Sequence, residues 1–279
     1  MVSAGLDDVL VPYNIVGKGK LERLARLLEH ANVAVTVDDG ELLRGLEWAA
    51  AEGGRELSVL VECDTGLGRA GVQSPAEAAE LGWLIERFPS LRFGGFVTFP
   101  TPPCARGFLA EAVEHAERRG LEVATVSTGG TPTMWSSGEL RPVVTEYRAG
   151  TYAFHDRNTL SAGAGTLGDV ALTVVATVVS RPTPERALLD AGSKSLSSDR
   201  GPDEGFGMIV EAPESAIPRL YEEHAYVELA PGETLELGQT VHVVPNHACV
   251  VANLFDELVV TRDGEIVDRW PVDARGRSA

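Results

Sequence analysis

Two adjacent glycines flanked by hydroxyl side chains have residue types and a spacing that suit ligand binding. The stretch runs from Ser127 to Thr133 and follows a β-branched run at 123–126. Its central residues are Thr128, Gly129, Gly130 and Thr131. Glycine lets a backbone approach a ligand closely, and the threonines add donors, so the stretch predicts a cup for a phosphate group. A tight turn after a buried strand has the same pattern, and both interpretations stay open here.

A second loop with a candidate residue is Glu62 to Gly71, which contains Arg69 between glycines. It follows the strand expected at 57–61, at the end of the strand where barrel enzymes place their sites. Arginine in that position suits an anionic oxygen of a cofactor or substrate. An ion pair with Asp64 that braces the loop is the alternative.

Tyr152 and His155 lie shortly after the glycine pair. The Tyr152 side chain suits closing over a ring or hydrogen bonding to a phosphate. A packing role with a satisfied hydroxyl is the alternative for a tyrosine near a domain junction, and the same holds for His155.

His247 and Cys249 are separated by one residue and follow an expected strand at 240–244. If that strand continues, both side chains project from one face. Imidazole and thiolate together are good zinc donors, and two protein ligands leave positions open for water or substrate, as in a catalytic metal site. The alternative is that Cys249 is a small core residue.

Lysine is scarce, because Lys18, Lys20 and Lys194 are the only three in the chain. Lys194 lies in a small polar loop that suits an imine-forming nucleophile, but nothing adjacent in the sequence desolvates it or lowers its pKa. The polar cluster from Glu222 to His224 indicates either a surface or the lining of a cleft.

The first part of the chain alternates short β-branched runs with amphipathic runs, which is typical of βα units around a parallel sheet. Strands are expected at 9–11, 33–37, 57–61, 93–98 and 123–126, with helices between them. A capping box at Ser74–Glu77, with proline at the first helical position, opens one of these helices. About five units are fewer than a closed barrel needs, and Met1–Gly5 looks like the tail of a helix. The sequence therefore predicts an incomplete (β/α)8 barrel of the TIM type over residues 1–158, lacking its first strands.

After this region the sequence pattern changes, and residues 159–279 predict a mostly antiparallel β domain with short strands and Gly, Pro and Asp turns. Strands are expected at 172–179, 187–189, 226–229, 240–244, 258–261 and 265–270.

Composition and sequence pattern also bear on nucleic-acid binding, cellular location and disulfide bonds. The 279 residues carry 41 acidic and 24 basic side chains, a formal net charge of −17, which argues against nucleic acid as a partner. No apolar run is long enough for a membrane span and no secretory signal pattern is present, so a cytoplasmic location is expected. Three widely spaced cysteines do not indicate a disulfide framework.

In their order along the chain, these motifs resemble those of the D-serine dehydratase and D-threonine aldolase family, in the alanine-racemase-like, fold-type III group of pyridoxal-phosphate enzymes. The motifs that carry the resemblance are Asp64-Thr65-Gly66 with Arg69 and Gly71, Ser127–Thr133, Gly150-Thr151-Tyr152 with Asp156, Asp190–Lys194, Glu222–His224 and Pro245–Cys249.

The resemblance implies a barrel that binds pyridoxal phosphate, a β domain and a homodimer. It further implies that Thr128, Gly129, Gly130 and Thr131 hold the cofactor phosphate and that Arg69 and Tyr152 border the cofactor. By the same likeness His247 and Cys249 bind zinc or another divalent metal. His-x-Cys is similar to the dehydratase branch, which converts a β-hydroxy D-amino acid to a 2-oxo acid and ammonia, whereas the aldolase branch yields glycine and an aldehyde.

One departure from the family concerns the lysine that bonds the cofactor. In the family it lies on an early barrel strand, and Lys18, Lys20 and Lys194 do not match it. No catalytic residue is therefore assigned within the chain, and a binding protein without turnover stays an alternative.

Overall fold

The computed structural model describes residues 1–201 and 204–277. The chain divides into two compact units, Met1–Ala149 and Gly150–Ala279. Each is described separately below.

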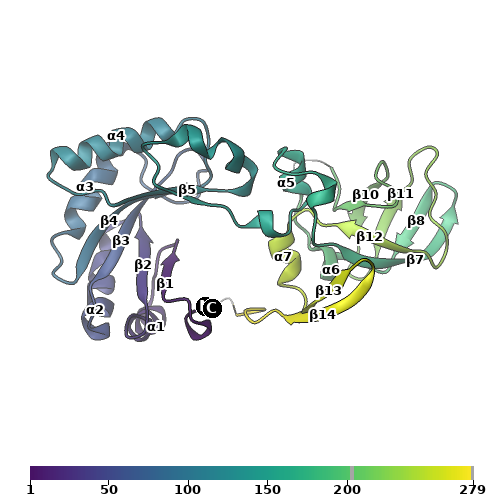
Figure 1. The fold of residues 1–279 in the computed structure, drawn as a ribbon, viewed down its shortest axis with the longest axis horizontal. Helices are drawn as coiled ribbons and strands as arrows, with labels where there is room; N and C mark the ends of the chain where they lie inside the picture. The colour runs from purple at the N-terminus through teal and green to yellow at the C-terminus, as the bar shows by residue number, and fades with distance from the viewer. Residues whose placement is uncertain (202–203, 278–279) are drawn as a thin grey trace. The chain divides into compact units, whose positions relative to one another are not determined.

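The first unit is built on six parallel strands that follow one another across the sheet in chain order (Figure 1). The strands are β1 (Asp8–Val11), β2 (Asn32–Val37), β3 (Leu57–Cys63), β4 (Leu91–Thr98), β5 (Thr125–Gly129) and β6 (Glu146–Arg148). The α-helices are α1 (Lys18–Leu28), α2 (Leu43–Gly53), α3 (Pro75–Ile85) and α4 (Ala105–Arg118). Short 3-10 helices are η1 (Val2–Ala4), η2 (Gly40–Leu42) and η3 (Thr131–Leu140).

The four α-helices pack along one face of this sheet, and the hydrophobic core lies between the two layers. On β2, for example, Val33, Val35 and Val37 belong to that core. Since side chains alternate along a strand, Thr36 projects from the opposite face, which we call the inner face. Parallel strands connected by helices in this order form part of a TIM-type barrel, and the expected fold class is confirmed.

Local sequence signals determine two helix ends, and the first of them was expected. The Ser74 side chain accepts a hydrogen bond from the Glu77 backbone, and the capping box at the start of α3 is complete. Helix α2 ends at Gly54, whose φ of 64° is the left-handed conformation that favours glycine.

The end of β5 differs from the sequence interpretation, which ended the strand at residue 126. The strand continues to Gly129, because β6 pairs with it in parallel, Gly129 opposite Arg148. A Cβ on Gly129 would lie 2.2 Å from the Arg148 carbonyl oxygen. The sixth strand was not expected, since its three residues, Glu146, Tyr147 and Arg148, carry no apolar run.

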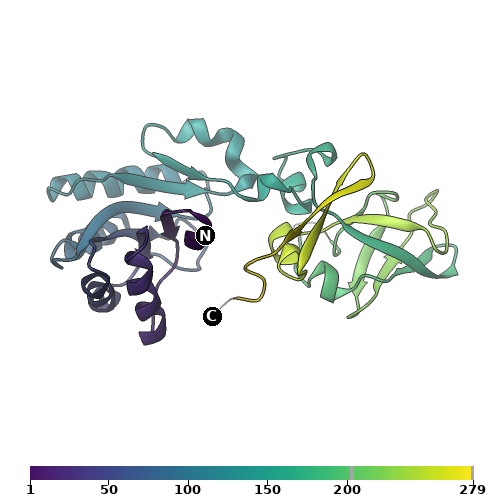
Figure 2. The ribbon, with the colours of Figure 1, turned by 60° about the horizontal axis from the view of Figure 1, so that its bottom comes forward.

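The second unit contains a six-stranded sheet in the order β10-β11-β8-β7-β12-β9, in which every neighbouring pair is antiparallel. Its strands are β7 (Val174–Thr183), β8 (Arg186–Leu189), β9 (Met208–Ile209), β10 (Ala216–Leu220), β11 (Ala225–Glu228) and β12 (Thr240–Val244). Strands β13 (Glu257–Arg262) and β14 (Glu265–Pro271) form a separate hairpin, drawn in yellow in Figure 2. This is the expected antiparallel β domain, with β9 and β10 as additional strands.

Short helices connect these strands and carry the polar groups considered below. They are η4 (Thr151–Ala153), α5 (Arg157–Ser161), η5 (Leu167–Asp169), α6 (Ser193–Leu196) and α7 (Ala248–Ala252). Across the described part of the chain, no helix combines the length and apolar character that crossing a membrane requires.

The close approach of β5 and β6 predicts a large difference between two glycine substitutions. Gly129→Ala places a methyl group against the Arg148 backbone, and we expect a loss of about 1 to 3 kcal/mol in the free energy of unfolding. Gly107→Ala is the matched control: nothing lies within 4 Å of its Cβ in α4, and alanine favours helix by about 0.5 to 1 kcal/mol. Urea denaturation measures both, and equal stabilities of the two variants would contradict this account of β5.

Candidate functional site

The inner face of the first unit carries a connected polar network at the carboxyl ends of three neighbouring strands. On β5 and β6, the Ser127 hydroxyl donates to the Glu146 carboxylate and accepts from the Arg148 guanidinium. Arg148 also donates to the Thr98 carbonyl at 3.0 Å, at the end of β4. Burial lowers the pKa of Arg148, and the Glu146 and Glu62 carboxylates oppose this effect. The result is an arginine held in one orientation on the inner face.

Glu62, near the end of β3, is a buried carboxylate on the same face, with 8% of its surface exposed. Burial raises its pKa, Arg69 and Arg148 act in the opposite direction, and Asp38 adds to the increase. Glu62 is thus a carboxylate whose pKa is shifted by burial, two arginines and a second carboxylate. Groups with shifted pKa values are common at functional sites.

One buried polar atom near Glu62 and Asp38 lacks a partner in the described part of the chain: the Asn14 side-chain oxygen. Thr36 is close enough to Glu62 to lower the pKa of that carboxyl. The Asn14 amide nitrogen donates to Asp38 at 2.6 Å, so its oxygen is free to accept. Because buried polar groups are usually satisfied, this oxygen favours a polar ligand on the inner face.

Arg69 does not brace its loop through Asp64. The Asp64 carboxylate instead accepts the backbone N–H groups of Gly66 and Gly68, at 2.9 and 3.1 Å, which lowers its pKa. The Arg69 guanidinium carbon lies 5.5 Å from the centre of the Phe99 ring. Arg69 thus rests over an aromatic ring in the first unit.

The Thr128–Thr131 stretch is tied to its surroundings by internal hydrogen bonds. The Thr101 hydroxyl donates to the Gly129 carbonyl, so Thr128, whose hydroxyl lies 2.8 Å from it, donates to Thr101. The Gly130 N–H donates to the Arg148 carbonyl at 2.9 Å. These bonds are what a tight turn requires, and they already use the Thr128 hydroxyl proton and the Gly130 N–H.

Phe99 connects this stretch to Arg69. A Cβ on Gly130 would meet the Phe99 ring at 3.4 Å, and the φ of 123° at Gly130 is a conformation that favours glycine. Thr131, at the start of η3, is 2% exposed. Arg69 and Gly130 therefore share Phe99 as a neighbour, which the sequence did not indicate because Phe99 lies outside both motifs.

Tyr152 lies in the second unit, in η4, with 55% of its surface exposed. His155 in the same unit is buried, its Nδ1 3.2 Å from the Thr159 hydroxyl. His155 therefore has a hydrogen-bond partner within its own unit, which agrees with the packing role given above as the alternative.

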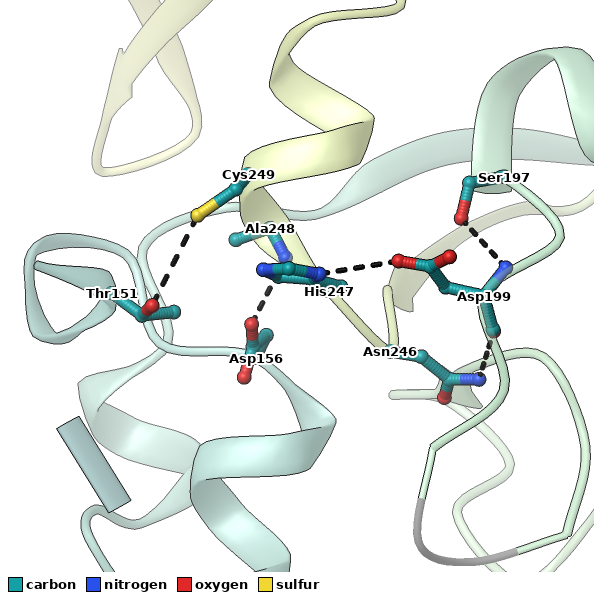
Figure 3. A network of polar contacts seen from close by, with 8 residues as sticks. All are labelled: Thr151, Asp156, Ser197, Asp199, Asn246, His247, Ala248 and Cys249. Atoms are coloured by element: carbon teal, nitrogen blue, oxygen red, sulfur yellow. Dashed lines mark hydrogen bonds and ion pairs between the residues drawn. The ribbon is translucent and has the colours of Figure 1, made fainter. Parts of the chain in front are cut away.

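His247 and Cys249 do not lie on a continued strand, which corrects the sequence interpretation. Strand β12 ends at Val244, His247 is the N-cap residue of α7, and Cys249 lies in the first turn of that helix. The two side chains nevertheless approach each other, and Cys249 lies 4.0 Å from the Thr151 hydroxyl (Figure 3).

Two carboxylates from different segments accept hydrogen bonds from the turn that contains this pair (Figure 3). Asp199 accepts a hydrogen bond from His247 Nδ1 at 3.1 Å. Asp156, 1% exposed, accepts the Ala248 N–H at 3.0 Å. Asp156 belongs to a motif that carries the family resemblance, whereas Asp199 lies outside those motifs and was not singled out from the sequence.

The Cys249 thiol and the His247 imidazole shift each other's pKa. Hydrogen bonding with Cys249 raises the pKa of His247 to about 9 despite partial burial, and Asp199 acts in the same direction. The same contact with His247 lowers the pKa of Cys249. The pair therefore favours thiolate and imidazolium, and soft sulfur and nitrogen donors become available once a metal displaces the proton.

A complete metal cage is not present among residues 1–201 and 204–277, in which no group of three or more His, Cys, Asp or Glu side chains is arranged to hold an ion. His247 and Cys249 fit a metal by the chemistry of their donors and would leave its other positions open.

No lysine is placed to bond a cofactor on the inner face. Lys18 is 87% exposed at the start of α1, and Lys20 follows it on the same exposed turn. Lys194 is 59% exposed and lies 2.7 Å from Glu223 and 3.6 Å from Glu222. Those carboxylates raise the pKa of Lys194, which is the opposite of what an imine-forming nucleophile requires.

Comparison with known proteins identifies the chain's class and then its family. Residues 11–158 match the model of the alanine racemase N-terminal domain, and residues 171–261 match the model of the serine dehydratase domain. A (β/α)-barrel unit followed by a β unit is the architecture of alanine-racemase-like proteins. The chain belongs to the D-serine dehydratase and D-threonine aldolase family within that class.

Individual relatives are similar over nearly the whole chain. A D-threonine aldolase from Arthrobacter sp is 33% identical over 99% of this chain and 76% of the relative. The solved D-threonine aldolase from Filomicrobium marinum has a TM-score of 0.85 and 31% identity, covering 99% of this chain and 79% of that one.

The D-threo-3-hydroxyaspartate dehydratase from Delftia sp. HT23 has a TM-score of 0.81 and 28% identity, covering 96% of this chain and 79% of that one. Variants of a D-threo-3-hydroxyaspartate dehydratase have also been solved in which a histidine or a cysteine, two positions apart, is replaced by alanine, the cysteine variant in a metal-free form.

The contact between His247 and Cys249 predicts the pH dependence of thiol alkylation in the metal-free protein. Because the pKa of Cys249 is lowered, its thiolate persists to lower pH, and its reaction with iodoacetamide should reach half of its maximum below the ordinary thiol value of about 8.5. His247→Ala should move this midpoint upward. Peptide-resolved mass spectrometry follows Cys249 separately from Cys104, which is exposed, and from Cys63, whose burial raises its pKa. A midpoint unchanged in His247→Ala would contradict the pairing.

Proposed function

We propose that this protein is a metal-dependent and pyridoxal-phosphate-dependent lyase for β-hydroxy D-amino acids, of the dehydratase type that releases a 2-oxo acid and ammonia. The observation that carries the proposal is the His247–Cys249 pair at the start of α7. A histidine and a cysteine at the same spacing are the residues replaced in the dehydratase variants, and the cysteine variant is described as metal-free.

The metal would be held by His247 Nε2 and the Cys249 thiolate, since Asp199 occupies Nδ1. A divalent ion bound there would supply Lewis-acid chemistry, which suits departure of a β-hydroxyl group. Asp156 maintains the turn that presents both ligands by accepting the Ala248 N–H. Zinc suits this donor set best, because thiolate and imidazole are its common ligands.

The inner face of the first unit is where we propose that pyridoxal phosphate binds. Arg69 and Arg148 bring positive charge to that face, which suits an anionic cofactor. The Asn14 side-chain oxygen, which lacks a partner in the described part of the chain, also favours a polar ligand there. We propose that Thr131 and the Gly129–Gly130 backbone approach the phosphate.

The three lysines do not fit covalent attachment, since all of them are exposed and Lys194 is paired with glutamates. No reaction step is therefore assigned to a lysine of this chain. In this proposal the 279 residues bind the cofactor, the metal and the substrate, and the reaction class is inferred from the family.

Aldol cleavage to glycine and an aldehyde is the second candidate. It is favoured by the 33% identity to the D-threonine aldolase from Arthrobacter sp over 99% of this chain. Product analysis separates the two reactions, because D-serine elimination yields a 2-oxo acid whereas D-threonine cleavage yields glycine.

We also propose that the protein acts in the cytoplasm as a homodimer on small D-amino acids and does not bind nucleic acid. The formal net charge of −17 supports the last part, since a phosphate backbone would be repelled.

Metal binding tests the observation that carries the proposal. The purified chain is expected to bind one zinc ion per molecule after dialysis, and Cys249→Ala should abolish stoichiometric binding because half of the protein donors are lost. Cys104→Ala is the matched control, since that cysteine is also exposed but lies in the first unit. Wild-type protein without zinc in elemental analysis, or full zinc retention by Cys249→Ala, would overturn the assignment.

Recognition of the substrate can be measured without a lysine. The borohydride-reduced adduct of pyridoxal phosphate with D-serine is a stable probe, and we expect it to bind more tightly than the L-serine adduct. Arg69→Ala should weaken binding about tenfold to a hundredfold, as expected for a lost charged hydrogen bond. The control is Arg44→Ala, which removes an exposed arginine on α2. Equal affinities for the two adducts in calorimetry would count against a D-amino-acid substrate.

A further inference from the structure

The contact between His247 and Asp199 fixes which nitrogen of the imidazole is available to a ligand. A carboxylate only accepts hydrogen bonds, so the Nδ1 atom 3.1 Å from Asp199 Oδ2 must carry a proton. In Figure 3 the other ring nitrogen points away from Asp199. In the neutral ring the lone pair is therefore on Nε2, the nitrogen on the far side of the ring from Asp199.

Asp199 is itself held in place by the residue that precedes His247. The Asn246 side chain, 1% exposed, donates to the Asp199 carbonyl and to the Gly205 carbonyl, both at 2.9 Å. The Ser197 hydroxyl accepts the Asp199 N–H at 3.1 Å. The backbone of Asp199 is therefore hydrogen-bonded to Asn246, which belongs to the same segment as His247.

A loose surface ion pair would not show these features. Exposed pairs contribute little, because both side chains move freely and solvent screens them. Here Asp199 and His247 are 45% and 39% exposed, but the backbones on both sides are anchored through one buried asparagine. The arrangement restricts the orientation of the ring and its proton, and charge attraction is only part of its effect.

We propose that Asp199 is a positioning residue of the metal site: it holds Nδ1–H of His247 and so directs Nε2 to the ion that Cys249 also binds. This inference rests on the proposed function, since it presupposes that the pair binds a metal. Outer partners of ligating histidines orient the ring and increase its basicity, and their loss typically reduces metal affinity by about 10-fold to 100-fold.

The test compares zinc affinity in Asp199→Ala and Asp199→Asn, measured by competition with a chromophoric chelator. Asp199→Ala should raise the dissociation constant for zinc by about 10-fold to 100-fold. Asp199→Asn should restore most of the affinity, because its amide oxygen still accepts from Nδ1–H. The matched control is Glu211→Ala, which removes a carboxylate 2.7 Å from Nδ1 of His242 in the same unit and should leave zinc affinity unchanged.

A second measurement reports on the ring itself. The Nδ1–H proton of His247 should give a downfield NMR signal, slow to exchange, in wild-type protein and in Asp199→Asn but not in Asp199→Ala. Urea denaturation of each variant identifies any general loss of folding.

The outcomes separate the inference from the proposed function. Wild-type protein that binds no zinc would overturn the metal part of the proposed function, and the inference with it. If the wild type binds zinc but Asp199→Ala binds equally well, or if Asp199→Asn is as weak as Asp199→Ala, the positioning role is wrong while metal binding stands.

Discussion

The second unit depends on one buried carboxylate, that of Asp156. One of its oxygens accepts the Thr159 N–H at the start of α5, and the other accepts the Ala248 N–H at the start of α7. The residues joined in the second contact are 92 positions apart in the chain. A buried acid is costly to desolvate unless its oxygens are satisfied, and here two helix starts satisfy it. The position of the His247-Ala248-Cys249 turn follows from this requirement.

The sequence was informative where the determinants are local. The Ser74–Glu77 capping box depends on residues within one turn and was predicted correctly, and the left-handed Gly54 that ends α2 is a local feature of the same kind. The order of the short motifs along the chain also identified the family, because the order of motifs can persist while the residues between the motifs diverge.

Long-range contacts could not be predicted in the same way. Asp199 lies 48 positions before His247, and no local pattern joins them. Strand β6 exists because β5 provides a partner, not because its own residues favour a strand. The same applies to His247 and Cys249: alternation along a strand would also have brought them together, but a helix start does so instead.

The parallel sheet of the first unit begins at β1 and ends at β6, and among the described residues neither strand has a second neighbour. Within these residues each outer strand has backbone groups that no second strand pairs, and such groups can act as templates for another chain. Because the two edges differ, one copy's β6 joining another copy's β1 would give an open, head-to-tail filament and not a closed pair. Both outer strands are short, and mutual repulsion between molecules of charge −17 opposes such growth. Added salt screens that repulsion, so we expect association of copies through these strand edges to increase with ionic strength.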